Sequence, residues 1–140
     1  MKILLPVDGS DYTKRMLAYL AAHSELLAGD HEYTLFTVIE PYAPHEVNFA
    51  KAVSMEDFMR ERAEQVLGPV RSFAQQQGWK VRVDYVPGSP VSAIVEKAEA
   101  LQPDLIVMGT HGRSPLGTFV LGSVANGVLG NCKVPVLLIR

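Results

Sequence analysis

Short apolar runs alternate along the chain with longer amphipathic stretches, which is the pattern of an α/β fold. Five apolar runs predict buried strands, at residues 3–7, 33–39, 79–86, 103–108 and 134–139. Apolar residues at helical spacing predict helices at residues 11–28, 55–77 and 90–101, and a short one from about residue 122. Strands that alternate with helices indicate one parallel sheet, with right-handed crossovers and both faces covered.

Capping residues mark several of the predicted boundaries. Ser10 can cap the first helix and Gly29 can end it. Ser89 followed by Pro90 is a good N-cap and first-turn pair for the helix that runs to residue 101. Residues 41–54 follow neither period, and we predict a loop or irregular segment there.

Length and charge narrow the class of protein. A chain of 140 residues predicts one domain, residues 1–140, with a sound core. The net charge is −2 and the thirteen Lys and Arg form no basic block, so we expect no nucleic-acid surface. No run approaches the ~20 apolar residues that span a bilayer. The apolar stretch before Pro6 is also too short for a signal-peptide core, and a cytoplasmic protein with no membrane partner is expected.

Reactive side chains form no catalytic or metal-binding pattern. The single cysteine, Cys132, excludes an intramolecular disulfide and precedes an apolar run, which favours a small buried filler over a reactive thiol. His111 lies far along the chain from the other histidines, in no metal-ligand spacing. Ser123 lies in G-S-V and not in the nucleophile elbow G-x-S-x-G. We therefore assign no catalytic residue and no metal ligand.

The most informative stretch is Gly109-Thr110-His111-Gly112, followed after nine residues by Gly122-Ser123. It comes directly after an apolar strand and leads into a helix. Glycine lets the backbone take positive φ and approach a ligand closely. The N–H groups and dipole of a helix start favour an anion, most simply the phosphate of a nucleotide. The alternative is that these glycines only form turns.

Two familiar phosphate loops do not fit this chain. The dinucleotide fingerprint needs G-x-G-x-x-G after the first strand, where the sequence reads PVDGS. Residues 112–118 have the glycine spacing of a Walker A loop but lack its lysine. Because that lysine normally reaches the β- and γ-phosphates, a P-loop hydrolase is disfavoured.

The glycine motif resembles that of the universal stress protein family, in its nucleotide-binding branch. Residues 1–15, MKILLPVDGSDYTKR, are similar to the family's opening strand and Asp-Gly-Ser turn. Residues 103–108, PDLIVM, and 134–139, VPVLLI, are similar to its fourth and fifth strands. The resemblance spans essentially the whole chain and implies an open five-stranded sheet of order 3-2-1-4-5. In that order a crevice opens at the carboxyl ends of strands one and four, where ligands bind in α/β sheets.

The resemblance also implies roles for individual residues at this crevice. Asp8 could accept hydrogen bonds from ribose hydroxyls or a base amine, or it could instead cap the first helix or its turn. The resemblance favours contact between Asp8 and adenosine. Val38 would offer backbone groups to the adenine edge. The alternative is that Val38 is only a residue of the hydrophobic core. Arg113 could neutralise phosphate or be a solvated cation. The implied contacts are Pro6, Val7, Asp8, Val38, Met108, Gly109, Thr110, His111, Gly112, Arg113, Gly122, Ser123 and Val124.

The sequence thus predicts an ATP-binding regulatory module of the stress response, with Mg²⁺ or Mn²⁺ held mainly by the phosphates and water. Two alternatives stay open, a slow nucleotide hydrolase and a ligand-free interaction module. The last strand, Val134 to Ile139, would lie at an apolar sheet edge. Such an edge favours association, so a two-fold homodimer through this strand is expected.

Overall fold

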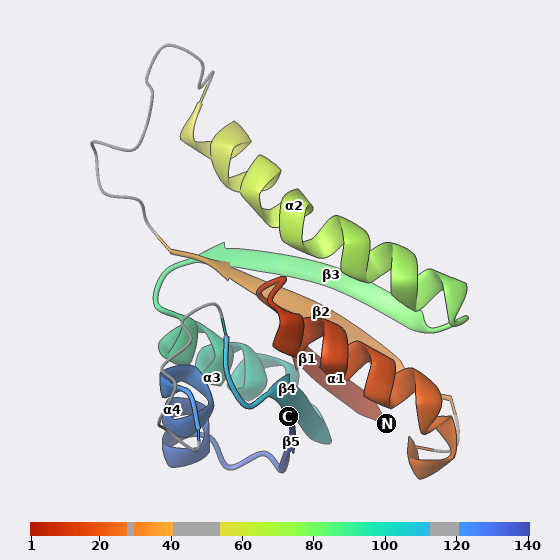
Figure 1. The fold of residues 1–140 in the computed structure, drawn as a ribbon. Coiled ribbons are helices and arrows are strands. Elements are labelled where there is room, and N and C mark those ends of the chain that lie inside the picture. Colours follow the sequence, from red (N-terminus) through yellow and green to blue (C-terminus); the bar gives the residue numbers. More distant parts are fainter. Residues whose placement is uncertain (28–29, 41–53, 113–120) are drawn as a thin grey trace.

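A computed structural model describes residues 1–27, 30–40, 54–112 and 121–140 of the chain. Within these ranges strands and helices alternate along the sequence (Figure 1). The strands are β1 (Lys2–Pro6), β2 (Glu32–Ile39), β3 (Lys80–Pro87), β4 (Leu105–Gly109) and β5 (Val136–Ile139). The helices are α1 (Asp11–Ala22), the 3₁₀ helix η1 (Ser24–Leu27), α2 (Met55–Gln76), α3 (Pro90–Leu101) and α4 (Ser123–Asn131).

The five strands form one parallel sheet in the order β3-β2-β1-β4-β5, which confirms the predicted fold and strand order. Its two faces have separate apolar cores, because successive side chains of a strand point to opposite faces. Leu5 of β1 belongs to the core under α1 and α2, whereas its neighbour Leu4 belongs to the core under α3 and α4. Figure 1 shows the two helix pairs on opposite sides of the sheet.

Helix α1 is shorter than predicted, which corrects the expected range of 11–28. Ser10 caps it as expected, since its side chain accepts a hydrogen bond from the backbone N–H of Thr13 at 3.4 Å. The helix ends at Ala22, and His23 takes φ −123° and ψ 43° as the C-cap. Ser24 then starts the 3₁₀ helix. Serine favours helix ends over helix interiors, because its hydroxyl competes for backbone hydrogen bonds.

One cap, one strand boundary and the burial of one side chain also differ from the sequence prediction. Ser89 does precede α3, but its side chain makes no capping hydrogen bond. Strand β5 begins at Val136 and not at residue 134, since Pro135 has no N–H to give and pairs only through its carbonyl, which accepts from Ile106 at 2.9 Å. Cys132 is half-buried against the core of α3 and α4, and is not the fully buried filler expected. Most of the predicted loop, residues 41–53, lies outside the described residues.

Helices α3 and α4 approach each other closely at a glycine. A Cβ built on Gly127 of α4 would lie 2.6 Å from a methyl group of Val91 in α3. A side chain there would therefore push the two helices apart. This contact joins the middle of α4 to the first turn of α3.

Candidate functional site

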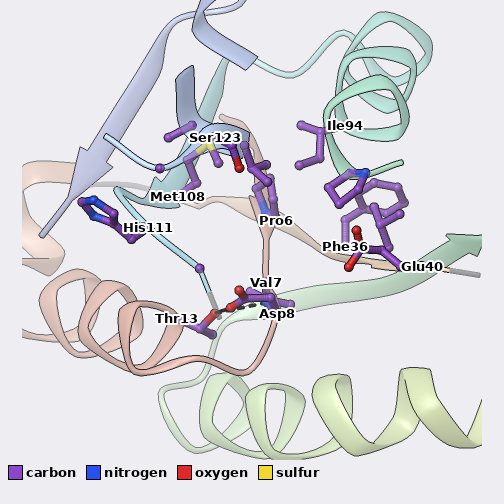
Figure 2. A pocket seen from close by; sticks show the side chains of 17 residues that line it. Pro6, Val7, Asp8, Thr13, Phe36, Glu40, Ile94, Met108, His111 and Ser123 are labelled. Carbon is purple, nitrogen blue, oxygen red and sulfur yellow. Dashed lines mark hydrogen bonds between the residues drawn. The ribbon is translucent and has the colours of Figure 1, made fainter. Parts of the chain in front are cut away.

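A cleft opens at the carboxyl ends of β1, β2 and β4, between the starts of α3 and α4 (Figure 2). Its volume is about 230 Å³. Since a water molecule takes up about 30 Å³ in the liquid, the cleft has room for a small organic ligand and not just for isolated waters. Its lining comes from both ends of the chain, because β1 and β4 are neighbours in the sheet.

Most of the residues predicted for the site do line this cleft. They are Pro6, Val7, Asp8, Val38, Met108, Gly109, His111, Gly112, Gly122, Ser123 and Val124. Thr110 does not, because it is buried and its backbone N–H donates to the carbonyl of Ile139 at 2.9 Å. Arg113 lies outside the described residues. The structure thus brings eleven of the predicted residues together, and their binding of a ligand stays a prediction.

Asp8 takes part in the β1–α1 turn, as one interpretation predicted, and it also lines the cleft, while its contact with adenosine stays a prediction. Its Oδ1 accepts from the backbone N–H of Ser10 at 3.0 Å and from the hydroxyl of Thr13 at 2.9 Å. Its Oδ2 points to Gly112, where a built Cβ would lie 2.6 Å away. One oxygen therefore holds the β1–α1 turn, in which Gly9 has a φ of +76°, and the other is directed to the glycine loop.

The loop glycines Gly109, Gly112 and Gly122 do not take the positive φ that was predicted for them, and their close approach to a ligand stays a prediction. A Cβ on Gly109 would instead lie 2.7 Å from the Cβ of Tyr12 in α1, and one on Gly112 would meet the carboxylate of Asp8. These two glycines let β4 and its loop approach α1 and the β1–α1 turn closely, which is a requirement of the protein's own packing.

The start of α4 offers backbone donors, but not the full set expected. The N–H of Gly122, the N-cap residue, donates to the carbonyl of Thr110 at 2.8 Å and is not available to a phosphate. The next N–H groups, of Ser123, Val124 and Ala125, are first-turn donors without an intrahelical acceptor. A Cβ on Gly122 would also lie 3.1 Å from the backbone of residues 110 and 111, so its substitution would disturb the loop.

The backbone N–H and carbonyl of Val38 point to the β1 side of β2, where the cleft lies. The carbonyl of Phe36 accepts from the N–H of Val7 at 2.8 Å, so this residue's backbone faces β1. Backbone groups alternate in direction along a strand, and Val38 therefore faces the same side. The pairing of β1 with β2 ends at Pro6 and Phe36, which leaves Val38 beyond the last paired residue.

The structure adds lining residues that the sequence analysis missed, which are Thr13, Phe36, Glu40, Pro90, Ile94 and Ala125. Phe36 and Glu40 lie two residues before and after Val38, and period-two spacing along β2 would have found them. Pro90 and Ile94 lie four residues apart on one face of α3, a spacing that is visible in the sequence. Their approach to β2 is a tertiary fact that no local pattern contains.

The charged groups on the described lining are all acidic. Asp8 and Glu40 contribute carboxylates, and no Lys or Arg is present on this part of the wall. The ring of His111 has its Nδ1 3.1 Å from the hydroxyl oxygen of Thr110 and packs against Tyr12, with ring centroids 5.1 Å apart. Among the described residues no three His, Cys, Asp or Glu side chains converge into a metal site. None of the described helices is long and apolar enough to cross a membrane.

Comparison with known proteins gives the family to which the chain belongs. The chain belongs to the universal stress protein family, whose model matches residues 1–140. A universal stress protein of Thermus aquaticus is 35% identical, over 99% of this chain and 97% of its own length. The universal stress protein MJ0577 of Methanocaldococcus jannaschii has a solved structure that matches with a TM-score of 0.77 at 28% identity, covering 99% and 94% of the two chains.

A more distant member has been solved with a nucleotide. This family protein of Arabidopsis thaliana, with AMP bound, matches with a TM-score of 0.67 at 21% identity. The match covers 99% of this chain and 90% of that protein. At this level of identity the likeness establishes the shared fold.

Proposed function

We propose that the protein binds ATP in the cleft, with the base toward β2 and α3 and the phosphates toward α4. The bound nucleotide would make it a regulatory module of the stress response in the cytoplasm. The proposal rests on the cleft of this chain. It is supported further by the AMP found in the plant member of the family.

The observation that carries the proposal is the end of β2, which stays paired with β3 but extends beyond its pairing with β1. Val38 presents an N–H and a carbonyl on the side where β1 has ended. Adenine has an acceptor, N1, beside a donor, the N6 amine, on one edge. These match a backbone N–H and carbonyl of a single residue, whereas guanine presents N1–H and O6 there and reverses the pattern. We therefore expect the protein to bind ATP in preference to GTP.

The remaining parts of the nucleotide fit the rest of the cleft. Ribose hydroxyls would donate to the Oδ2 of Asp8, which faces the loop at Gly112. The phosphates would meet the N–H groups of Ser123, Val124 and Ala125, where the helix dipole favours negative charge. The hydroxyl of Ser123, which is exposed at the first helical position, would donate as well.

A divalent cation completes the proposed complex. The described lining has two carboxylates and no Lys or Arg, so the phosphate charge needs a counterion. Mg²⁺ or Mn²⁺ would be held mainly by phosphate oxygens and water, since Mg²⁺ characteristically keeps several waters and binds through substrate phosphates. The protein would contribute the position of the phosphates and not a set of metal ligands.

The test is to denature the purified protein and to identify and quantify any nucleotide that is released. ATP in near-stoichiometric amount is the expected result. ADP or AMP alone would favour a slow hydrolase, and no nucleotide would favour an interaction module. Calorimetric titration of nucleotide-free protein with ATP and GTP then tests the base, and equal or better binding of GTP would contradict the adenine assignment.

We further propose a two-fold homodimer through β5, the edge strand at residues Val136–Ile139. The carbonyls of Pro135 and Ile139 accept hydrogen bonds from β4. Because directions alternate along a strand, the backbones of Val136 and Leu138 face the open edge. A second copy of β5 would pair with these groups, as an uncovered edge strand readily does.

A matched pair of substitutions at one residue tests this dimer. Val136→Pro removes an N–H from the open edge while leaving the first residue of the strand in a position that proline tolerates. Val136→Ala keeps the N–H and trims the side chain. Light scattering should show a monomer for the proline variant and a dimer for the alanine variant. A dimer in both variants would contradict pairing through this edge.

A further inference from the structure

We propose that Glu40 determines which base the cleft accepts, by taking a hydrogen bond from the exocyclic amine of adenine. The inference rests on the proposed binding of ATP and adds to it a side chain that reads position 6 of the purine. Asp8, the other carboxylate of the described lining, faces the glycine loop and is a separate contact.

Glu40 is held at the end of β2 and lines the cleft. It directly follows Ile39, whose carbonyl accepts from the N–H of Gly88 at 3.1 Å, so the strand is tied to the start of the β3–α3 connection at this point. Glu40 is the first residue after β2 and is exposed, and its side chain lines the cleft together with Phe36 and Val38. Figure 2 shows its carboxylate beside Phe36, turned toward the cleft and far from Asp8 and Thr13.

The direction of the strand decides which atom of the base comes near Glu40. Within one residue the N–H lies toward the preceding residue and the carbonyl toward the following one. When adenine pairs with Val38, N1 accepts from the N–H and the N6 amine donates to the carbonyl. The amine is therefore on the side of residues 39 and 40. One N6 proton is used by Val38, and the second points on toward the end of the strand.

The chemistry of a carboxylate favours an amine at that position. An ionised Glu accepts hydrogen bonds and donates none. It would accept the second N6 proton of adenine, and it would repel the O6 oxygen of hypoxanthine or guanine. No Lys or Arg is present on the described lining to offset this charge. Glu40 therefore adds discrimination at position 6 to that given by the backbone of Val38.

The experiment compares ATP with ITP, which differ in the purine at position 6, an amine in one and a keto oxygen in the other. Affinities for both are measured by calorimetry for the wild type and for Glu40→Gln, whose amide has nearly the same shape and can donate to an oxygen. Glu32→Gln is the matched control, because Glu32 is an exposed residue at the opposite end of the same strand.

We expect the wild type to prefer ATP, and Glu40→Gln to reduce that preference about tenfold, the value of one hydrogen bond to a charged group. Glu32→Gln should keep the wild-type preference. A wild-type ratio in Glu40→Gln, with ATP still bound, would overturn the role of Glu40 and leave the proposed function intact. A wild type that binds neither nucleotide would overturn both, so the two failures are distinguishable.

Discussion

The two ends of the cleft are lined by different kinds of groups. At the end near β2 and α3 the walls are the side chains of Phe36, Glu40 and Ile94. The backbone of β2 also faces the cleft there, beyond the last residue that pairs with β1. At the end near β4 and α4 the walls are mostly glycine and the first turn of a helix. One end thus offers shape and specific hydrogen-bonding groups, and the other offers close backbone approach and dipoles.

The comparison shows that two glycines of the loop make room for the protein's own side chains. Gly109 is packed against Tyr12 and Gly112 against Asp8, so a side chain at either position would first collide with the protein. Substitution can therefore distinguish a glycine that affects stability through packing from one that affects ligand binding through a neighbouring side chain. Four substitutions test this distinction.

Gly112→Ala should have the largest effect on ATP binding. The new methyl group would lie 2.6 Å from Oδ2 of Asp8 and would turn that carboxylate away from the ribose. Losing two hydrogen bonds to a charged group predicts a fall in affinity of about a hundredfold, measured by calorimetry. In an Asp8→Ala background the same substitution should cost little more. Additive losses in the double variant would show that Asp8 is not the cause.

Gly109→Ala should act on stability. Its Cβ would come within 2.7 Å of the Cβ of Tyr12, an atom that cannot move without α1. Overpacking of this kind costs roughly 1–3 kcal/mol, so we expect the melting temperature to fall by about 3–10 °C. A normal melting temperature combined with lost ATP affinity would instead assign Gly109 to the ligand.

Ser123→Ala should weaken ATP binding without changing stability. The hydroxyl is exposed at the start of α4 and would donate to a phosphate in the proposed complex. Removing one hydrogen bond to a charged group predicts a loss of about tenfold in affinity. The melting temperature of the nucleotide-free variant should stay at the wild-type value. Unchanged affinity would remove Ser123 from the phosphate end. This residue is a cleaner probe than Gly122, whose substitution would press on residues 110 and 111.

Gly130→Ala should have the smallest effect and serves as the control for the other glycines. It lies within α4, and a Cβ there would have no atom within 4 Å. Alanine is the better helix former by up to about 1 kcal/mol, which predicts a rise of at most about 3 °C in melting temperature. ATP affinity should not change. A loss of stability in Gly130→Ala would show that the effects at Gly109 and Gly112 do not come from the contacts of the added methyl group.

The architecture was predictable from the sequence because it depends on local periodicity. The apolar runs gave the five strands to within two residues at each end. The apolar stripe of α2 is buried from Ala63 to Val70 as its spacing predicts, whereas Met55 at the start of the helix is exposed. The predicted end of α1 was wrong, because a helix boundary depends on local hydrogen bonds, here around His23 and Ser24. The spacing of apolar residues does not indicate such bonds. The strand order came from the resemblance to a family, since pairing between strands leaves no periodic trace.

The site divides in the same way. By itself the sequence determined that a strand, a glycine loop and a helix start follow one another, because these features are consecutive along the chain. The packing of distant segments brings Glu40, Phe36 and Ile94 to the same wall, and places Gly109 against Tyr12 and Gly112 against Asp8. The physical reason is distance along the chain: β1 and β4 are neighbours in the sheet although about a hundred residues separate them. A local pattern reports what a residue prefers, and the packing of distant segments decides what it touches.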